Sequence, residues 1–157
     1  MCIRDRPYGP TGADEMEFMI CTNTGEEAKP LAKIASGGEL ARIMLAIKHV
    51  LAEKDGIGTI IFDEVDTGVS GRAAQKIGKK LAEVARHRQV ICVTHLAPVA
   101  ACAAHHYRIY KTVEDGRTFT RVEELTRPQR VQELARIMVG ENITDSALKS
   151  AEEMLES

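Results

Sequence analysis

The 157-residue sequence lacks several features that would assign it to a membrane, secreted or zinc-binding class of protein. No apolar run reaches the roughly 18–20 residues that cross a membrane, and no secretory hydrophobic segment lies near the N-terminus. The four cysteines form no CxxC pair, so the ligand spacing of a zinc site is absent. We therefore expect free thiols in a reducing cytoplasm, and no membrane as a partner.

The sequence also lacks an excess of charge of one sign. The formal net charge is −2, so no global positive field indicates nucleic acid as a partner. With 44% hydrophobic and 28% charged residues, the composition is typical of a globular domain with a buried core. The length fits one domain, or one large lobe of a bigger one.

The first six residues, MCIRDR, show no periodicity shared with the rest of the chain. We interpret residues 1–6 as a non-native leader and exclude them from the fold prediction. No internal repeat, low-complexity tract or linker interrupts the remaining residues. Residues 7–157 are therefore expected to form one lobe.

Two short apolar runs, TIIF at 59–62 and VICV at 90–93, predict strands buried on both faces of a parallel sheet. Between them, residues 71 to about 88 have helical periodicity. Three apolar residues share the inward face of that helix, namely Ile77, Leu81 and Val84. Strand, helix and strand together make a βαβ unit, so the predicted fold class is α/β with flanking helices.

The other expected elements surround this unit. Residues 17–25 are strand-like, and the segment with Pro30 is expected to be a loop. A helix is expected at about 38–54, with Gly56 as a C-cap. Its predicted inward face consists of Leu40, Ile43, Met44, Ile47 and Leu51.

Beyond the second strand the pattern predicts a short helix, a hairpin and two longer helices. Pro98 fits the first turn of the short helix, and Asp115-Gly116 is a strong hairpin turn signal. The next helix ends at Gly140, with Val131, Leu134, Ala135 and Met138 facing inward. The last helix is capped by Thr144 or Asp145.

The first candidate site comes after the strand at 59–62, where the sequence continues as DEVDTGVSG. Ligands of an open α/β sheet bind at the carboxyl ends of its strands. Asp63 there is suited to hold Mg²⁺ through its water shell, and Glu64 to orient or deprotonate a water molecule. The alternative is an acidic turn after a buried strand.

The second candidate is His95, which comes after the strand at 90–93. Neighbouring parallel strands bring their ends together, so His95 is placed to contact a phosphate oxygen or the attacking water. The alternative is a partly buried structural histidine. His105 and His106 have no such context, and we expect both on the surface.

The third candidate is the stretch Ser36-Gly37-Gly38-Glu39 at the start of the first long helix. Two glycines let the backbone approach a ligand closely, and the helix start presents unpaired N–H groups that bind phosphate. An ordinary Ser N-cap with a capping box explains Ser36 and Glu39, but not both glycines.

In this order and at these distances, SGGE, IIFDEVD and VTH resemble the C-terminal half of an ATP-binding-cassette (ABC) ATPase head. The phrases KPLAKIASGGELARIMLAIK and VICVTHLAPVAACAAHHY are most similar to the SMC-like branch, and within it to the RecN family of bacterial DNA repair proteins. The resemblance covers about residues 12–157. It implies a P-loop NTPase fold, ATP and Mg²⁺ as cofactors, a homodimer of ATP-sandwiched heads, DNA as a partner, and a cytoplasmic, nucleoid-associated protein.

The resemblance also implies a role for each candidate residue. Ser36, Gly37, Gly38 and Glu39 would form the signature motif, which reaches the γ-phosphate of ATP held by the opposite head. Asp63 would position Mg²⁺, Glu64 would be the general base, and His95 would contact the γ-phosphate. Asp66 to Ser70 would form the D-loop at the dimer seam.

One departure from the family pattern is the absence of a GxxxxGK[ST] phosphate-binding loop (the Walker A motif). The Q-loop and the coiled coil expected before the signature motif are absent too. We therefore expect a fragment that hydrolyses ATP only when completed by the N-terminal half of the head and dimerised.

Two other functions remain open at this point. A transporter's nucleotide-binding domain shares these motifs, although SGGEL and DEVDTGVSG favour the SMC-like branch over SGGQ and SALD. A non-catalytic head-dimerisation module is the second alternative, and the presence of Asp63, Glu64 and His95 argues against it. A DEAD-type helicase does not place a Gly-Gly helix start 25 residues before its aspartate.

Overall fold

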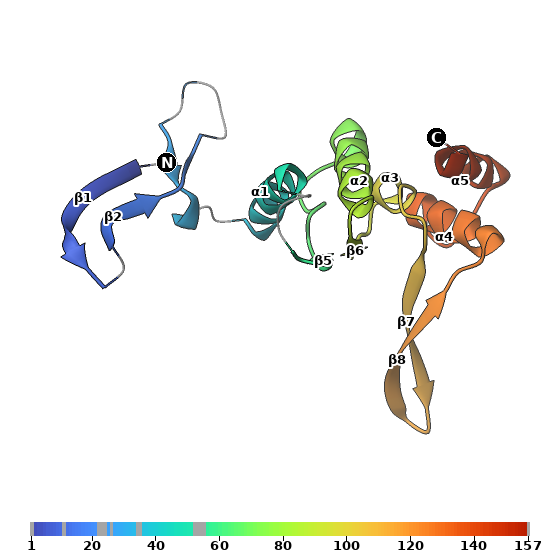
Figure 1. The fold of residues 1–157 in the computed structure, drawn as a ribbon. Coiled ribbons are helices and arrows are strands. Elements are labelled where there is room, and N and C mark those ends of the chain that lie inside the picture. Colours follow the sequence, from blue (N-terminus) through green and yellow to red (C-terminus); the bar gives the residue numbers. More distant parts are fainter. Residues whose placement is uncertain are drawn as a thin grey trace.

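The computed structural model describes residues 2–10, 12–21, 25, 27–33, 36–51 and 56–156. The arrangement is elongated, with a β-hairpin at the N-terminal end, a βαβ unit in the middle and two helices at the C-terminal end (Figure 1). A second hairpin projects from the C-terminal part. No helix within these ranges combines the length and the apolar character needed to cross a bilayer.

The middle of the chain is the βαβ unit that the pattern predicts. Strand β5 (Thr59–Phe62) pairs in parallel with β6 (Gln89–Cys92), and α2 (Gly71–Ala85) connects them. The side of α2 that faces the sheet consists of Ala74, Ile77, Leu81 and Val84, all buried in the main core cluster. The prediction of a parallel βαβ unit with this helix face is confirmed. The second strand begins and ends one residue earlier than expected.

The sheet is covered on one face only, so the prediction of strands buried on both faces is wrong for the described residues. Phe62 is buried, whereas Ile61, Ile91 and Val93 are 45–67% exposed. Side chains of a strand alternate between the two faces, and α2 covers just one of them. The uncovered face is apolar, which is unusual for a surface in contact with water.

Helix α1 (Gly37–Val50) begins where expected but ends earlier and buries a different side. Its C-cap is Leu51, so Gly56 is not the C-cap, and residues 52–55 lie outside the described part. Leu45 is 4% exposed and packs on the main core with Ala41. The expected inward face instead includes four residues that are 38–44% exposed, namely Leu40, Met44, Ile47 and Leu51. That prediction was wrong because α1 packs against α2 through its other side.

The C-terminal helices form a second, smaller core. Helix α3 (Ala97–Ala100) has Pro98 in its first turn, as expected. Helix α4 (Arg127–Val139) packs against α3, and α5 (Asp145–Glu156) packs against α4. The buried members of this core are Ala97, Leu134, Ala135, Ala147 and Ala151, with Val131 and Met138 packed against them.

The ends of the last two helices agree with the sequence signals. Gly140 ends α4 with a φ of 80°, a left-handed value that favours glycine. The Thr144 hydroxyl accepts a 3.3 Å hydrogen bond from the Ala147 N–H, so Thr144 caps α5. The choice between Thr144 and Asp145 is thereby settled.

The projecting hairpin consists of β7 (Tyr107–Glu114) and β8 (Arg117–Glu124). Its turn residues Asp115 and Gly116 have φ values of 51° and 73°, as a type I′ turn requires. The predicted hairpin is confirmed.

The N-terminal segment differs from the expectation. Strand β1 (Cys2–Gly9) pairs with β2 (Gly12–Glu17), so residues 2–6 take part in a hairpin. Excluding them from the fold was wrong, whereas their origin as a leader stays a prediction. Only Met19–Ile20 of the expected strand at 17–25 forms β3, which pairs with β4 (Lys29–Pro30). A 3-10 turn (Leu31–Lys33) comes next, and residues 22–24 lie outside the described part.

Candidate functional site

The carboxyl ends of β5 and β6 lie side by side and carry the central candidate residues. Phe62 pairs with Cys92, and the Val93 N–H donates a 2.9 Å hydrogen bond to the Phe62 carbonyl. Asp63 and Glu64 continue from β5, and Thr94 and His95 continue from β6. The predicted meeting of these two strand ends is therefore confirmed.

The side chain that joins the two loops is Asp66. It is only 2% exposed, and its Oδ2 accepts a 2.5 Å hydrogen bond from the Thr94 hydroxyl. The same oxygen accepts a 3.2 Å bond from the His95 N–H and lies 3.5 Å from His95 Nδ1. The carboxylate of Asp66 thus holds the loop after β6 and is not presented to solvent.

The loop between β5 and α2 is held by its own backbone. The Thr67 N–H donates a 3.0 Å hydrogen bond to the Glu64 carbonyl, and the Val65 side chain of the loop is fully buried. Glu64 has a φ of 57°, which non-glycine residues adopt rarely. This conformation turns the chain at the strand end and leaves the side chains of Asp63 and Glu64 exposed.

The N-terminus of α1 lies against this loop. Ser36 is the N-cap, and its hydroxyl accepts a 3.4 Å hydrogen bond from the Glu39 N–H. A Cβ atom on Gly37 would lie 2.8 Å from Glu64 Oε2. A Cβ atom on Gly38 would lie 2.9 Å from the Thr67 carbonyl oxygen.

Both glycines therefore permit a close approach, as the sequence suggested, but the approaching group is the chain's own loop. A carboxylate near a helix N-terminus is electrostatically favourable, because the first N–H groups carry partial positive charge. The Glu64 carboxylate occupies that position beside Gly37.

Arg42 is a residue that sequence reasoning missed. Its Nη1 donates hydrogen bonds to the carbonyls of Thr67, at 2.8 Å, and Val65, at 3.3 Å. It lies one turn after Gly38 on α1 and so fixes the helix start to the loop. Thr94 was missed as well, and the only signal for it was its place between a strand end and His95.

The remaining candidates are accessible. His95 is 73% exposed, and Ser70, the N-cap residue of α2, makes no side-chain capping hydrogen bond. His105 is exposed as expected. His106 is only 9% exposed, so its expected surface position was wrong. Burial, and then the positive charge of Arg130, lower the pKa of His106.

The electrostatics of the strand ends favour a cation. The pKa of the Cys92 thiol is raised to about 11, first by burial and then by the negative charges of Asp66 and Asp63. Asp63 offers an exposed carboxylate, the oxygen donor that Mg²⁺ prefers when water and phosphate complete its shell. Within the described ranges no three or more His, Cys, Asp and Glu side chains gather as a metal site.

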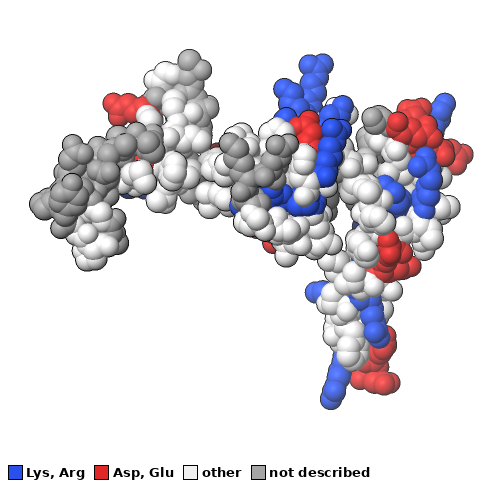
Figure 2. Space-filling view, viewed as in Figure 1, with Lys and Arg blue, Asp and Glu red and all other residues white. Residues whose placement is uncertain are grey.

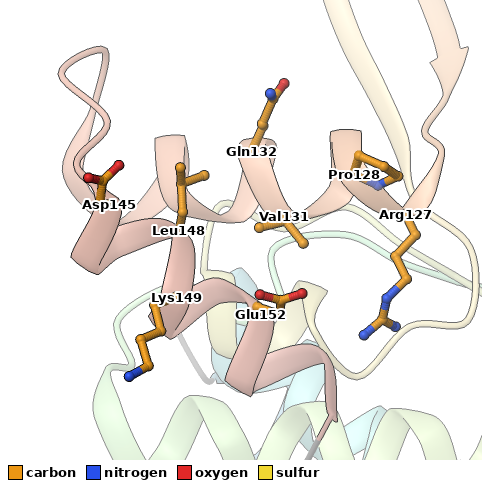
Figure 3. A pocket seen from close by; sticks show the side chains of 8 residues that line it. All are labelled: Arg127, Pro128, Val131, Gln132, Asp145, Leu148, Lys149 and Glu152. Carbon is orange, nitrogen blue, oxygen red and sulfur yellow. The ribbon is translucent and has the colours of Figure 1, made fainter.

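A separate hollow lies between α4 and α5, away from the strand ends (Figure 3). Its volume is about 610 Å³. It is lined by Arg127, Pro128, Val131, Gln132, Asp145, Leu148, Lys149 and Glu152. The lining mixes both charges and contains none of the candidate residues.

Comparison with known proteins finds relatives among the bacterial DNA repair proteins named RecN. The chain is 50% identical over 144 residues to the DNA repair protein RecN of Bacillus subtilis, matching 92% of this chain and 25% of that protein. It is 45% identical over 154 residues to RecN of Treponema pallidum, matching 98% of this chain and 27% of that protein. The chain therefore spans about a quarter of the length of these relatives. No protein-family model matches it.

The fold has a counterpart among solved structures. The structure of the Smc head domain with a coiled coil and joint, from Pyrococcus yayanosii, aligns with 82% of this chain and 23% of that chain. The TM-score is 0.58 at 23% sequence identity. The chain is thus a mixed α/β unit that resembles part of an SMC head domain.

Proposed function

We propose that this chain is the C-terminal lobe of an ATP-hydrolysing head that serves DNA double-strand break repair and recombination. The reason is that the chain is a RecN homologue over nearly its whole length. The observation that carries this proposal is the shared edge at the ends of β5 and β6. There Asp63, Glu64 and His95 are all exposed and lie on two loops joined by Asp66.

The proposed chemistry divides among these residues. Bound Mg²⁺ would neutralise charge on the phosphates of ATP, and Asp63 is the carboxylate placed to hold it. Glu64 accepts the proton of the attacking water as general base. His95 would contact the γ-phosphate, and its Nδ1 lies 3.5 Å from Asp66 Oδ2.

The signature residues Ser36, Gly37, Gly38 and Glu39 are proposed to bind the γ-phosphate held by a second head. The N-terminus of α1 suits an anion, and in this chain the Glu64 carboxylate already lies there. A phosphate arriving from a partner would take the place of that carboxylate. The loop from Asp66 to Ser70 would lie at the seam between the heads, with Asp66 as its internal support.

The N-terminal half of the head is the proposed first partner, and it would bring the phosphate-binding loop. The uncovered apolar surface that supports this has two parts, one on the outer side of α1 and one on the free face of the β5–β6 sheet. Its members are Leu40, Met44, Ile47, Leu51, Ile61, Ile91 and Val93, each 38–67% exposed. Covering such a surface would remove the contact of these side chains with water.

The test is steady-state ATP hydrolysis by this chain mixed with a separately made N-terminal half. Turnover is expected only in the mixture, and Glu64→Gln should reduce it by a factor on the order of 10²–10⁴. Glu39→Gln, a carboxylate change at the signature motif, is the matched comparison that tests the dimer contact instead.

A non-catalytic dimerisation module remains the second candidate function. It would give heads that associate in the mixture, with no turnover in any combination. Turnover that is indifferent to Glu64→Gln would show that the general base is assigned wrongly. The transporter alternative is disfavoured by the RecN relatives.

A further inference from the structure

Helix α2 carries a basic face on the side opposite its buried residues. Five exposed positions form this face, namely Arg72, Lys76, Lys79, Lys80 and the C-cap residue Arg86. At 3.6 residues per turn they fall within an arc of about 120°. Figure 2 shows Lys and Arg side chains gathered over α2, with an acidic group among them.

The charge of this face is unusual for the chain that carries it. Between residues 71 and 86 the only acidic side chain is Glu83. Glu83 is paired with Lys80 at 2.6 Å and lies 3.6 Å from His49 of α1. Five cationic groups therefore face one carboxylate on a protein whose formal net charge is −2.

We propose that the basic face of α2 binds the phosphate backbone of double-stranded DNA without reading its sequence. The distance along the helix from Arg72 to Arg86 is about 21 Å at 1.5 Å per residue. Successive phosphates of one strand lie about 3.4 Å apart along the duplex axis, so the face spans about six of them. Lysine and arginine are among the side chains that contact DNA phosphates, and they neutralise the phosphate charge.

The composition of the face favours duplex over single-stranded DNA. Proteins that bind single strands stack bases on aromatic side chains. Residues 71–86 contain no Phe, Tyr or Trp. The side chains on this face can therefore hold phosphates but cannot stack on unpaired bases.

The location of the face keeps it accessible. It lies on the far side of α2 from the β5–β6 sheet, whereas the apolar surface proposed for the N-terminal half includes the other face of that sheet. The inference rests on the proposed function only in choosing DNA as the polyanion. It requires neither ATP nor a second head.

The experiment measures fluorescence anisotropy of a labelled duplex of about 30 base pairs, without ATP, between about 50 and 200 mM salt. The test variant is Arg72→Gln/Lys76→Gln/Lys79→Gln. The matched control, Lys111→Gln/Arg117→Gln/Lys149→Gln, removes the same charge from exposed positions of the hairpin and α5. The control variant has the same net charge as the test variant. A difference in affinity between them therefore reports contacts at the basic face of α2 and not general electrostatic attraction.

We expect the α2 variant to bind the duplex roughly tenfold or more weakly than the wild type. The slope of log K against log salt concentration should be less steep by up to about 2.7, or about 0.9 per lost phosphate contact. The control should bind like the wild type, and a single strand of equal length should bind more weakly than the duplex. Equal weakening by both variants, or no wild-type binding at about 50 mM salt, would overturn the proposal. The proposal would also be overturned if poly-glutamate displaced the duplex at equal charge concentration, because that result would identify an acidic protein segment as the ligand. Since ATP is left out, failure of the ATPase test would leave this result unchanged.

Discussion

The Thr94 hydroxyl donates a 2.5 Å hydrogen bond to Oδ2 of Asp66, across 28 residues of sequence. This bond joins the loop after β5 to the loop after β6. The Thr94 oxygen also accepts a 3.1 Å bond from the Leu96 N–H, so it connects the loop to the start of α3. The positions of Glu64 and His95 relative to each other therefore depend on one buried carboxylate and one hydroxyl.

Replacing Thr94 with valine should destabilise the protein by about 1–3 kcal/mol, because a buried carboxylate loses a partner while side-chain volume is kept. Urea unfolding measures the change. The control is Thr59→Val, since the Thr59 hydroxyl donates only to exposed Gln89 at 3.0 Å. The control should change stability by less than about 0.5 kcal/mol. Equal effects of the two substitutions would contradict the role given to Asp66.

Alanine at Gly38 should be more harmful than alanine at Gly37, although both begin the same helix. The Gly38 Cβ would press on the Thr67 backbone carbonyl, which can move only with its loop, at a cost of about 1–3 kcal/mol. The Gly37 Cβ would meet the end of the flexible Glu64 side chain, which can turn away. Thermal unfolding of both variants checks the order, and a less stable Gly37→Ala variant would contradict it.

Cys92 should be nearly inert to alkylation at neutral pH. A pKa of about 11, against an ordinary value near 9, lowers its thiolate fraction about 100-fold. The pKa of Cys102 is also raised by burial, whereas Cys21 is exposed. Iodoacetamide labelling followed by mass spectrometry should show Cys21 modified before Cys102 and Cys92, and Cys92 only as the pH rises toward 11. Early modification of Cys92 in the folded protein would refute the expectation.

The parts of the fold that the sequence predicted depend on local signals. The Asp115-Gly116 turn requires positive φ values that these residue types adopt readily. The inward face of α2 agrees with helical periodicity, because a single sheet face lies beneath it. Both predictions needed information from only a few neighbouring residues.

The parts that the sequence did not predict depend on partners distant in the chain. The stripe from Leu40 to Leu51 does have helical spacing, but periodicity cannot tell which neighbour covers a face. The burial of Asp66 depends on Thr94, and that of His106 on packing beside Arg130. In the candidate site, the residue types and strand ends were predictable, whereas the contact between Glu64 and the start of α1 was not.

The contact between Glu64 and the start of α1 has a consequence for ATP hydrolysis by the proposed head. The Glu64 carboxylate, which we propose activates water, lies beside Gly37, on the surface that we propose binds the other head's nucleotide. In a solitary head, the proposed base would therefore occupy the surface proposed for the other head's nucleotide. Association with a second head would displace the Glu64 carboxylate from this surface, so that ATP hydrolysis would begin only when two heads associate.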